Sequence, residues 1–423
     1  MLTSIVGINW GDEGKGRMVD LLSEDYDIVV RYQGGNNAGH TVINEKGKFI
    51  LNLLPSGILR ENVVNVMGNG MVIDLKHLVG EMQKLTDAGI KITPENLKIS
   101  EKAVICMPYN VLQDGLEEQR LKDKKFGSTL RGIAPIYGDK YLKKAFRMGE
   151  LKNFDILKER LYGIVEWKNL LIAGGYKHEA IKAEEMIAYL EEYGGKLKDF
   201  VIDTSVYLDA AAKAGKKIMF EAQLGALRDI DFGIYPYTSS SSTISAYAPI
   251  GAGIPNHKLD SAIGIMKAYS TCVGEGPFTA EYFGEKAEAL RQAGGEYGAA
   301  TGRPRRVGPF DVVASKYGIR MQGATEIALT KLDVLTGLDE IEICSAYELD
   351  GKVIDEFPFT DVLDKCKPVF IKMKGWKEDI SSCRKKEDLP KAAVDYIEYI
   401  EKATGCKITY VSVGASREQY VKM

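Results

Sequence analysis

Short apolar runs alternate with amphipathic helical patterns through the first quarter of the chain. The pattern predicts strands at residues 4–8, 27–30 and 63–67, a hairpin around 45–47, and a helix over about 75–85. This rhythm is typical of a parallel sheet whose strands are joined by crossover helices. We therefore expect an α/β fold with a large, mostly parallel central sheet flanked by helices.

The rest of the chain continues the same alternation with two interruptions. Residues 121–149 are charged and contain glycine, which predicts a long functional loop, and residues 150–215 are helical and amphipathic, which predicts a cover for the sheet. Strands return at 217–220, 327–329 and 408–411. The length of 423 residues allows two or three domains or one unit with an extended sheet.

Composition and charge narrow the class of protein. Hydrophobic residues make up 45% of the chain and charged residues 27%, which is ordinary for a globular protein with a large core. The net charge of −3 provides no overall field for nucleic acid or an anionic membrane, so any anion site must be local.

Cysteine spacing and hydropathy indicate the cellular compartment of the protein. The six cysteines are far apart and form no C-x-x-C pair, which argues against a zinc site or a disulfide framework and favours reduced thiols. The sequence has no signal-peptide pattern and no apolar run of about 18 residues, so we expect a cytoplasmic protein that does not span a membrane.

The first strand runs into the glycine-rich turn at residues 11–16. Such a turn before a helix directs backbone N–H groups toward phosphate, and Lys15 adds a positive charge. The turn is not an ordinary P-loop, because Asn9 replaces its first glycine and Gly16 its metal-binding hydroxyl. Asp12 is the nearest oxygen ligand for a metal-bound phosphate. The alternative interpretation is a surface turn that merely uses glycine and acid.

A second polar loop follows the next strand, at residues 33–41. Loops that leave parallel strands at the same edge of a sheet converge on one crevice. His40 is therefore expected to face the first loop. Because its glycine- and asparagine-rich surroundings offer no apolar neighbours, we interpret His40 as an acid or a phosphate donor rather than as a buried structural residue.

Two later segments also favour anions. The Ser/Thr cluster at 238–243 is either a flexible linker or an ordered anion-binding turn, and its aromatic and apolar flanks favour the turn. Arg303, Arg305 and Arg306 follow a glycine-rich stretch. Because the chain has no wider basic surface, these arginines favour a small carboxylate or phosphate ligand over nucleic acid.

A third signal concerns a purine base. Lys331 and Asp333 follow an apolar strand and resemble the N-K-x-D signature of GTP-binding proteins. An aspartate there accepts from the ring N–H and the exocyclic amine of guanine, which favours guanine over adenine. Ser412 and Gly414, after the last strand, could close the other side of the base.

These stretches together resemble the adenylosuccinate synthetase family nearly from end to end. The motifs that carry the resemblance are WGDEGKG (10–16), GGNNAGHTV (34–42), LPSGIL (54–59), DIDFGIYPY (229–237), ATGRPRR (300–306) and LTKLDVL (329–335). The resemblance implies a ligase that couples L-aspartate to inosine monophosphate (IMP) using GTP and Mg²⁺, in purine biosynthesis. It also implies one domain over residues 1–423, with a P-loop-like GTP-binding fold of this family's type.

The resemblance implies a role for each matched residue. Asp12 would be the general base, His40 the general acid, and Asp12 with the carbonyl of Gly39 would bind magnesium. GTP would be bound by Gly11, Glu13, Gly14, Lys15, Gly16, Thr41, Arg305, Lys331, Asp333, Ser412 and Gly414. IMP would be bound by Asn37, Thr129, Lys143, Gln223, Leu224, Ser239 and Arg303, and aspartate by Ala300, Thr301, Arg303 and Arg305. Lys143 would be shared across a homodimer interface.

Several positions depart from the family pattern. Lys143 replaces an arginine, Leu130 a glycine, Ala300 a threonine and Ser239 a threonine. The family reads E-G-A-Q-G where residues 221–225 read E-A-Q-L-G, and the family's glutamine contacts the purine. An ungapped alignment puts Leu224 at that position, whereas two compensating gaps put Gln223 there.

These departures leave two alternatives open. One is a paralogue that couples aspartate to another 6-oxopurine nucleotide, GMP or dGMP. The other is a non-catalytic GTP-binding protein, although such a protein would need neither Asp12 nor His40.

Overall fold

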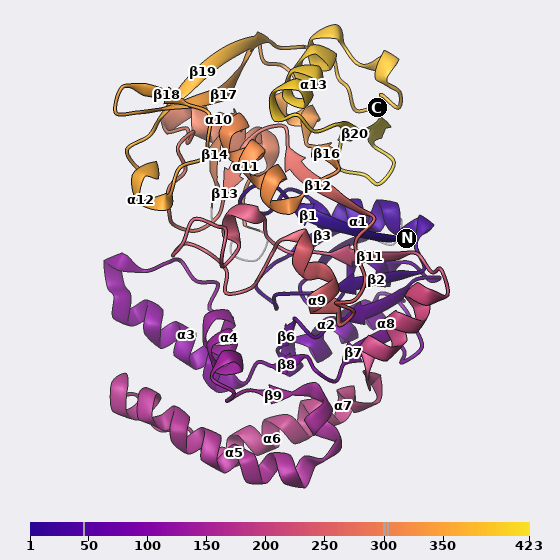
Figure 1. Ribbon diagram of the computed structural model, residues 1–423, viewed down its shortest axis with the longest axis vertical. Coiled ribbons are helices and arrows are strands. Elements are labelled where there is room, and N and C mark those ends of the chain that lie inside the picture. Colours follow the sequence, from indigo (N-terminus) through magenta and orange to yellow (C-terminus); the bar gives the residue numbers. More distant parts are fainter. Residues whose placement is uncertain (45–46, 299–301, 303) are drawn as a thin grey trace.

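The computed structural model describes residues 1–44, 47–298, 302 and 304–423 and is built around one ten-stranded sheet (Figure 1). The strand order is β10 (Val201–Ile202), β7 (Leu97–Ser100), β5 (Val64–Met67), β2 (Ile28–Arg31), β11 (Ile218–Glu221), β1 (Leu2–Gly7), β12 (Ser261–Lys267), β16 (Glu326–Thr330), β20 (Ile408–Ser412) and β21 (Tyr420–Lys422). Neighbouring strands are parallel except for the antiparallel pair β20–β21. The predicted mostly parallel central sheet is confirmed.

Helices flank this sheet, also as predicted. The longer ones are α1 (Lys15–Leu22), α2 (Leu75–Asp87), α3 (Pro108–Leu121), α4 (Ile133–Tyr141), α5 (Phe154–Asn169), α8 (Thr204–Lys213), α10 (Gly284–Gly294), α11 (Val312–Gln322) and α13 (Lys391–Thr404). Short helices are α6 (Ala183–Tyr189), α7 (Gly195–Leu197), α9 (Ala248–Ala252) and α12 (Thr360–Leu363). In Figure 1, α5 and α6 form the lower end of the molecule and α13 lies at the upper end.

Smaller sheets extend the structure on both sides. The upper one in Figure 1 combines β15 (Phe310–Asp311), β17 (Glu340–Leu349), β18 (Lys352–Ile354) and β19 (Lys367–Lys374). A three-stranded sheet combines β6 (Val72–Ile73), β8 (Val104–Ile105) and β9 (Phe146–Arg147). Two-stranded pairs are β3 (His40–Asn44) with β4 (Gly47–Leu51), which is the predicted hairpin, and β13 (Ser270–Cys272) with β14 (Arg306–Gly308).

Helix α2 shows how local sequence sets an element. Asp74 caps its N-terminus by accepting a hydrogen bond from the backbone N–H of His77 at 3.0 Å. Leu75, Leu78 and Leu85 lie on one face and are buried, as the helical period requires. The helix therefore begins and ends within two residues of the predicted range.

The prediction of one long loop over 121–149 is wrong in part. Helix α4 and strand β9 lie within that range, because Ile133, Ile136 and Tyr137 form an apolar face that packs on Val72 and Val104. An irregular segment remains at 125–132, where Asp114 accepts from the backbone N–H of Gly132 at 2.9 Å. The following region is helical as predicted, and its apolar side chains share a core with Ile99 of β7.

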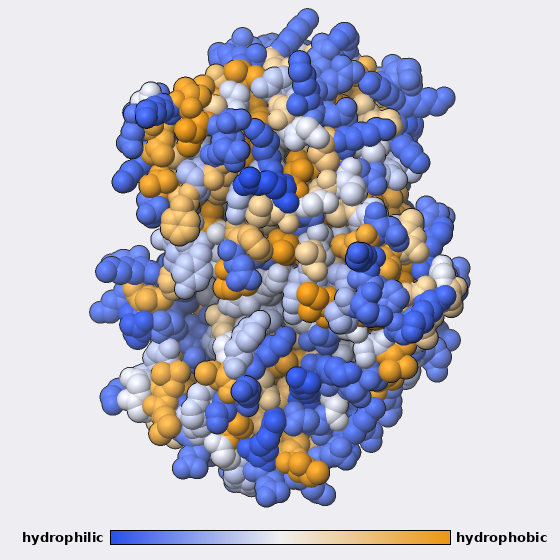
Figure 2. All heavy atoms as spheres, in the orientation of Figure 1, coloured by the Kyte–Doolittle hydropathy of each residue, from blue (hydrophilic) through white to orange (hydrophobic). Residues whose placement is uncertain are grey.

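The surface and the thiols complete the description. Apolar residues are scattered among polar ones on the face shown in Figure 2. Within the described residues, no helix has the length and apolar character needed to cross a bilayer. The six cysteines are buried free thiols, which agrees with the predicted absence of a disulfide framework.

Candidate active site

The loop after β1 is folded around the carboxylate of Glu13. This carboxylate accepts hydrogen bonds from the backbone N–H groups of Asn9 at 3.2 Å and Gly11 at 2.7 Å, and it pairs with Lys15 at 2.7 Å. Gly11 and Gly14 have φ of +102° and +97°, where a side chain would be strained. Backbone donors and a lysine therefore converge on an anionic group, as they would on phosphate.

Asp12 lies at the exposed side of the same loop. Its φ of 61° is in the left-handed region, which aspartate and asparagine adopt more readily than most residues. The carboxylate is 31% exposed and forms an ion pair with the Arg305 guanidinium at 2.9 Å. In this structure the Arg305 guanidinium therefore pairs with the carboxylate that we predict to be the general base and a magnesium ligand.

His40 is the first residue of β3 and is only 7% exposed, so the expectation of a loop without neighbours to bury it is wrong. Its Nδ1 lies 2.5 Å from Oε1 of Glu221. This Oε1 also accepts from the Ser56 hydroxyl at 2.6 Å, and Oε2 of Glu221 accepts from the Ser56 backbone N–H at 2.7 Å. The carboxylate favours the tautomer that carries its proton on Nδ1. Nε2 is buried and has no hydrogen-bond partner among the described residues.

The electrostatics of His40 follow from this burial. Desolvation lowers the pKa of His40, and the Glu221 carboxylate opposes that shift. Burial alone would raise the pKa of Glu221, but His40, Arg31 and Ser56 outweigh it and hold that pKa below its ordinary value. The imidazole is thus neutral at rest, with a carboxylate placed to stabilise a proton gained at Nε2.

Gly16 allows His40 to approach α1. A Cβ atom on Gly16 would lie 2.5 Å from Cβ of His40. Because Gly16 is inside a helix, alanine there improves helix propensity, and the contact alone opposes it. We expect Gly16→Ala to displace the imidazole and to lower kcat about 10- to 100-fold in a phosphate-release assay. Gly163→Ala in α5, where the added Cβ meets nothing within 4 Å, is the matched control, and equal activity of the two variants would contradict the expectation.

On the predicted IMP side, Gln223 is fully buried and is held by other polar groups. Arg31 donates to its Oε1, Gln33 donates to its carbonyl at 2.8 Å, and its own Nε2 donates to Oδ1 of Asn37 at 2.9 Å. Leu224 follows with a φ of 62° and is partly exposed. The structure therefore joins Gln223 to Asn37 and leaves Leu224 as the more open neighbour.

The serine cluster is an ordered turn. The backbone N–H of Ser239 donates to the backbone carbonyl of Arg228 at 2.8 Å, and the Ser241 hydroxyl donates to the side-chain oxygen of Gln33 at 2.8 Å. The backbone N–H of Thr243 donates to the Asp229 carboxylate at 2.5 Å. The linker interpretation is therefore wrong. The turn places Ser239 near Gln33, which also contacts Gln223.

Thr129 and Lys143 are both exposed. Leu130 adopts φ 56°, a left-handed conformation that costs a non-glycine residue about 1 kcal/mol but remains accessible to it. Lys143 has φ 61° just after α4. Three further predicted residues, Ala300, Thr301 and Arg303, lie outside the described residues.

The predicted guanine site lies at the ends of β16 and β20. Lys331 donates to the Gly294 carbonyl at 2.6 Å and to Glu296 at 3.0 Å. Oδ1 of Asp333 is buried and has no hydrogen-bond partner in the described part of the chain, and burial raises the pKa of this carboxyl. The Ser412 hydroxyl accepts from Arg17. Asp333 thus offers the free acceptor that a guanine edge requires.

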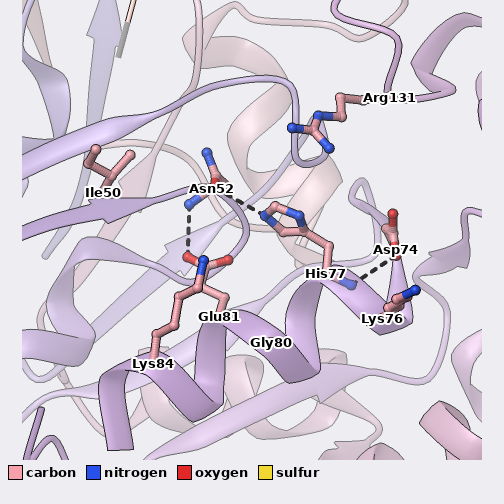
Figure 3. A pocket seen from close by; sticks show the side chains of 9 residues that line it. All are labelled: Ile50, Asn52, Asp74, Lys76, His77, Gly80, Glu81, Lys84 and Arg131. Atoms are coloured by element: carbon pink, nitrogen blue, oxygen red, sulfur yellow. Dashed lines mark hydrogen bonds between the residues drawn. The ribbon is translucent and has the colours of Figure 1, made fainter. Parts of the chain in front are cut away.

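A polar pocket of about 370 Å³ lies behind the second loop (Figure 3). It is lined by Ile50, Asn52, Asp74, Lys76, His77, Gly80, Glu81, Lys84 and Arg131. The His77 ring points toward Asn52, with Nε2 3.1 Å from Oδ1, and Asn52 donates to the Ala38 carbonyl at 2.8 Å. Asn52 therefore links His77 of α2 to the backbone just before Gly39 and His40.

Sequence reasoning missed four buried charged residues in the site, namely Arg31, Glu221, Lys267 and Glu296. Arg31, Glu221 and Lys267 are the last residues of β2, β11 and β12. A charge that closes an otherwise apolar strand is a signal that could have found them, because such a residue lies at the ligand-binding edge of the sheet.

The site thus combines a glycine-rich loop folded around a carboxylate with two buried atoms, Nε2 of His40 and Oδ1 of Asp333, that have no hydrogen-bond partner among the described residues. A family model described as adenylosuccinate synthetase matches residues 4–421. This chain belongs to the adenylosuccinate synthetase family. The adenylosuccinate synthetase of Caldanaerobacter subterraneus subsp. tengcongensis is 44% identical over 421 residues, covering 99% of this chain and 98% of that protein. That of Streptococcus gordonii is 42% identical over 416 residues, covering 98% and 96%.

Solved structures agree with this assignment. A fully ligated adenylosuccinate synthetase from Plasmodium falciparum matches with a TM-score of 0.93 at 37% identity, covering 100% of this chain and 99% of that one. A cyanophage S-2L succinoaminodeoxyadenylate synthetase bound to dGMP and dATP matches with a TM-score of 0.63 at 18% identity, covering 100% of this chain and 95% of that one. The second likeness concerns the fold alone.

Proposed function

We propose that this protein is an adenylosuccinate synthase, a GTP-hydrolysing ligase that forms a C–N bond between L-aspartate and IMP in purine biosynthesis. Family membership over nearly the whole chain supports the reaction. The observation that carries the proposal in the site is the pair of buried atoms, Nε2 of His40 and Oδ1 of Asp333, that have no hydrogen-bond partner in the part of the chain that the structure describes.

In the proposed mechanism, Asp12 removes the N1 proton of IMP and the 6-oxygen attacks the γ-phosphate of GTP. The aspartate amine then replaces phosphate at C6 of the 6-phosphoryl intermediate. His40 first gains a proton at Nε2, where the Glu221 carboxylate stabilises the imidazolium, and then donates from Nε2 to the charge that develops on the leaving GDP. Phosphoryl transfer depends mainly on positioning and charge neutralisation, which these groups supply.

Arg305 must leave Asp12 before this base can act. Its guanidinium fork suits a carboxylate or a phosphate, so aspartate or the transferred phosphoryl group is its natural alternative partner. The ion pair seen here therefore keeps Asp12 and Arg305 beside each other until substrates separate them.

Magnesium is part of the proposal. The described residues contain no group of three or more acidic, histidine or cysteine side chains that could hold a metal alone. Mg²⁺ is commonly bound through one or two carboxylates and substrate phosphates, and Asp12 offers one such carboxylate at the exposed side of its loop. Asp12 and the Gly39 carbonyl would hold it, and it would neutralise phosphate charge when bound.

The acceptor nucleotide is tested by product mass. The purified protein is incubated with GTP, magnesium and aspartate, together with IMP, GMP or dGMP in separate reactions. We expect phosphate release and a succinyl adduct with IMP. An adduct with only GMP or dGMP would instead support the paralogue. The structural reason to test it is that Gln223 is buried whereas Leu224 is more open. No adduct with any nucleotide would support the non-catalytic GTP-binding protein.

We further infer a cytoplasmic homodimer that shares Lys143 across its interface. The exposure of Lys143 beside the exposed apolar Tyr141 and Leu142 supports a contact with a second copy. Buried reduced thiols suit the cytoplasm.

Restoring the family's arginine at position 143 tests this arrangement. A guanidinium binds phosphate through two parallel hydrogen bonds where an ammonium acts as a point charge. We therefore expect Lys143→Arg to lower the KM for IMP about two- to tenfold, with the KM for GTP unchanged. Lys144→Arg is the neighbouring control. An unchanged KM for IMP would remove Lys143 from the phosphate site.

A further inference from the structure

Glu296 lies at the centre of a buried cluster of charges. The residue is 0% exposed, and its Oε1 accepts from Lys267 at 2.8 Å, Lys331 at 3.0 Å and the Tyr269 hydroxyl at 2.5 Å. Its Oε2 accepts from Arg305 at 2.6 Å. One carboxylate therefore binds three cations and a phenol.

The partners of Glu296 come from separate parts of the chain. Lys267 ends β12, Lys331 follows β16, and Arg305 lies just before β14. The backbone carbonyl of Glu296 also accepts from the N–H of Arg305 at 2.9 Å. Glu296 thus ties the end of the predicted aspartate loop to the edge of the central sheet.

Charge balance explains why this arrangement holds. A buried carboxylate without partners would be very costly, and here the three cations hold the pKa of Glu296 well below its usual range despite burial. Burial in turn lowers the pKa of Lys267 to about 8. Without Glu296, Lys267 would lose its carboxylate partner, while Asp12 would still pair with Arg305 and the Asp333 carboxyl would still act on Lys331.

We propose that Glu296 is a positioning residue that couples the guanine end of the site to its aspartate end, by holding Lys331 and Arg305 on one carboxylate. Arg305 bridges Glu296 and Asp12, so the chain Lys331, Glu296, Arg305, Asp12 spans both ends of the site. The inference rests on the proposed function, which assigns Lys331 to GTP and Arg305 to aspartate.

The IMP side provides an internal reference. Gln223 donates to Asn37 and accepts from Arg31 and Gln33, and these hydrogen bonds do not include Glu296. A loss of Glu296 should therefore affect GTP and aspartate together and leave IMP unaffected. A general disruption of the fold would affect all three substrates.

The test compares Glu296→Gln with wild type in steady-state assays for each substrate. We expect the KM values for GTP and aspartate to rise at least about tenfold, and the KM for IMP to change less than about twofold. Glu285→Gln, at an exposed glutamate of α10, is the matched control and should resemble wild type. Equal increases for all three substrates, or no increase for any, would overturn the proposal.

A second variant tests the charge argument and guards against misfolding of the first. Lys267→Met combined with Glu296→Gln removes one cation with the anion. We expect the GTP and aspartate KM values of this double variant to lie between those of wild type and Glu296→Gln, still at least about threefold above wild type. No improvement over the single variant would overturn the charge argument.

The two claims can fail separately. Formation of adenylosuccinate by the wild-type protein tests the proposed function before any variant is made. If the wild type forms none, the affinity for a fluorescent GTP analogue in the absence of turnover still tests Glu296. That affinity should fall at least about tenfold in Glu296→Gln, and an unchanged affinity would overturn the coupling.

Discussion

Replacing Asp12 with asparagine is expected to reduce phosphate release from GTP by about 10³-fold, within the range that general-base catalysis contributes. Asparagine matches aspartate in size and tolerates its left-handed φ of 61°, so the substitution removes charge and basicity without straining the loop. The glycines, Lys15 and the predicted guanine acceptor Asp333 remain. GTP binding should therefore change little.

Two measurements separate these effects. Phosphate release reports the chemical step, and equilibrium binding of a fluorescent GTP analogue reports the site. Asp231→Asn, at an exposed aspartate of the loop after β11, is a matched control that should keep wild-type activity. Near-normal turnover of Asp12→Asn would remove Asp12 from the role of base.

Replacing His40 with glutamine is expected to lower kcat about 10²- to 10³-fold, with a much smaller change in the KM for GTP. Glutamine still offers an amide to the Glu221 carboxylate, but it cannot deliver a proton to the leaving diphosphate. The structural reason is that Nε2 of His40 is buried and has no hydrogen-bond partner among the described residues, while Nδ1 lies 2.5 Å from Glu221.

The chain contains a suitable control for this substitution. His257 also pairs with a carboxylate, Asp209, at 2.8 Å, but this pair is partly exposed and neither residue is a predicted site residue. His257→Gln should leave kcat unchanged, which separates loss of a histidine–carboxylate pair from loss of the acid. If His40→Gln kept kcat within about threefold of wild type, general-acid catalysis by His40 would be refuted.

Much of the fold could be predicted from local pattern alone. The apolar runs at 4–8, 27–30 and 63–67 correspond closely to β1, β2 and β5. Strands of a parallel sheet are buried on both faces and are therefore nearly continuous apolar runs, which can be seen in the local sequence. Helix α4 was missed because its apolar face is short and lies within a charged, glycine-containing stretch.

The site was predicted less completely, because its geometry depends on contacts between distant residues. The residues just before His40 are rich in glycine and asparagine and do not indicate burial, yet His40 is buried against Gly16 and Glu221, which come from other elements. Likewise nothing near Glu296 in the sequence indicates that Lys267, Lys331 and Arg305 would meet there. Glycine turns and motif spacings identify the loops, whereas tertiary packing decides which side chains face one another.

The central claim is that the γ-phosphoryl group of GTP passes through the 6-oxygen of IMP. The most direct test uses IMP labelled with ¹⁸O at that oxygen, in the complete reaction with GTP, magnesium and aspartate. The account predicts that each phosphate released with adenylosuccinate carries the label, because the C6–O bond breaks when the aspartate amine replaces phosphate. Adenylosuccinate formed with unlabelled phosphate, and with the ¹⁸O recovered in water, would contradict the account.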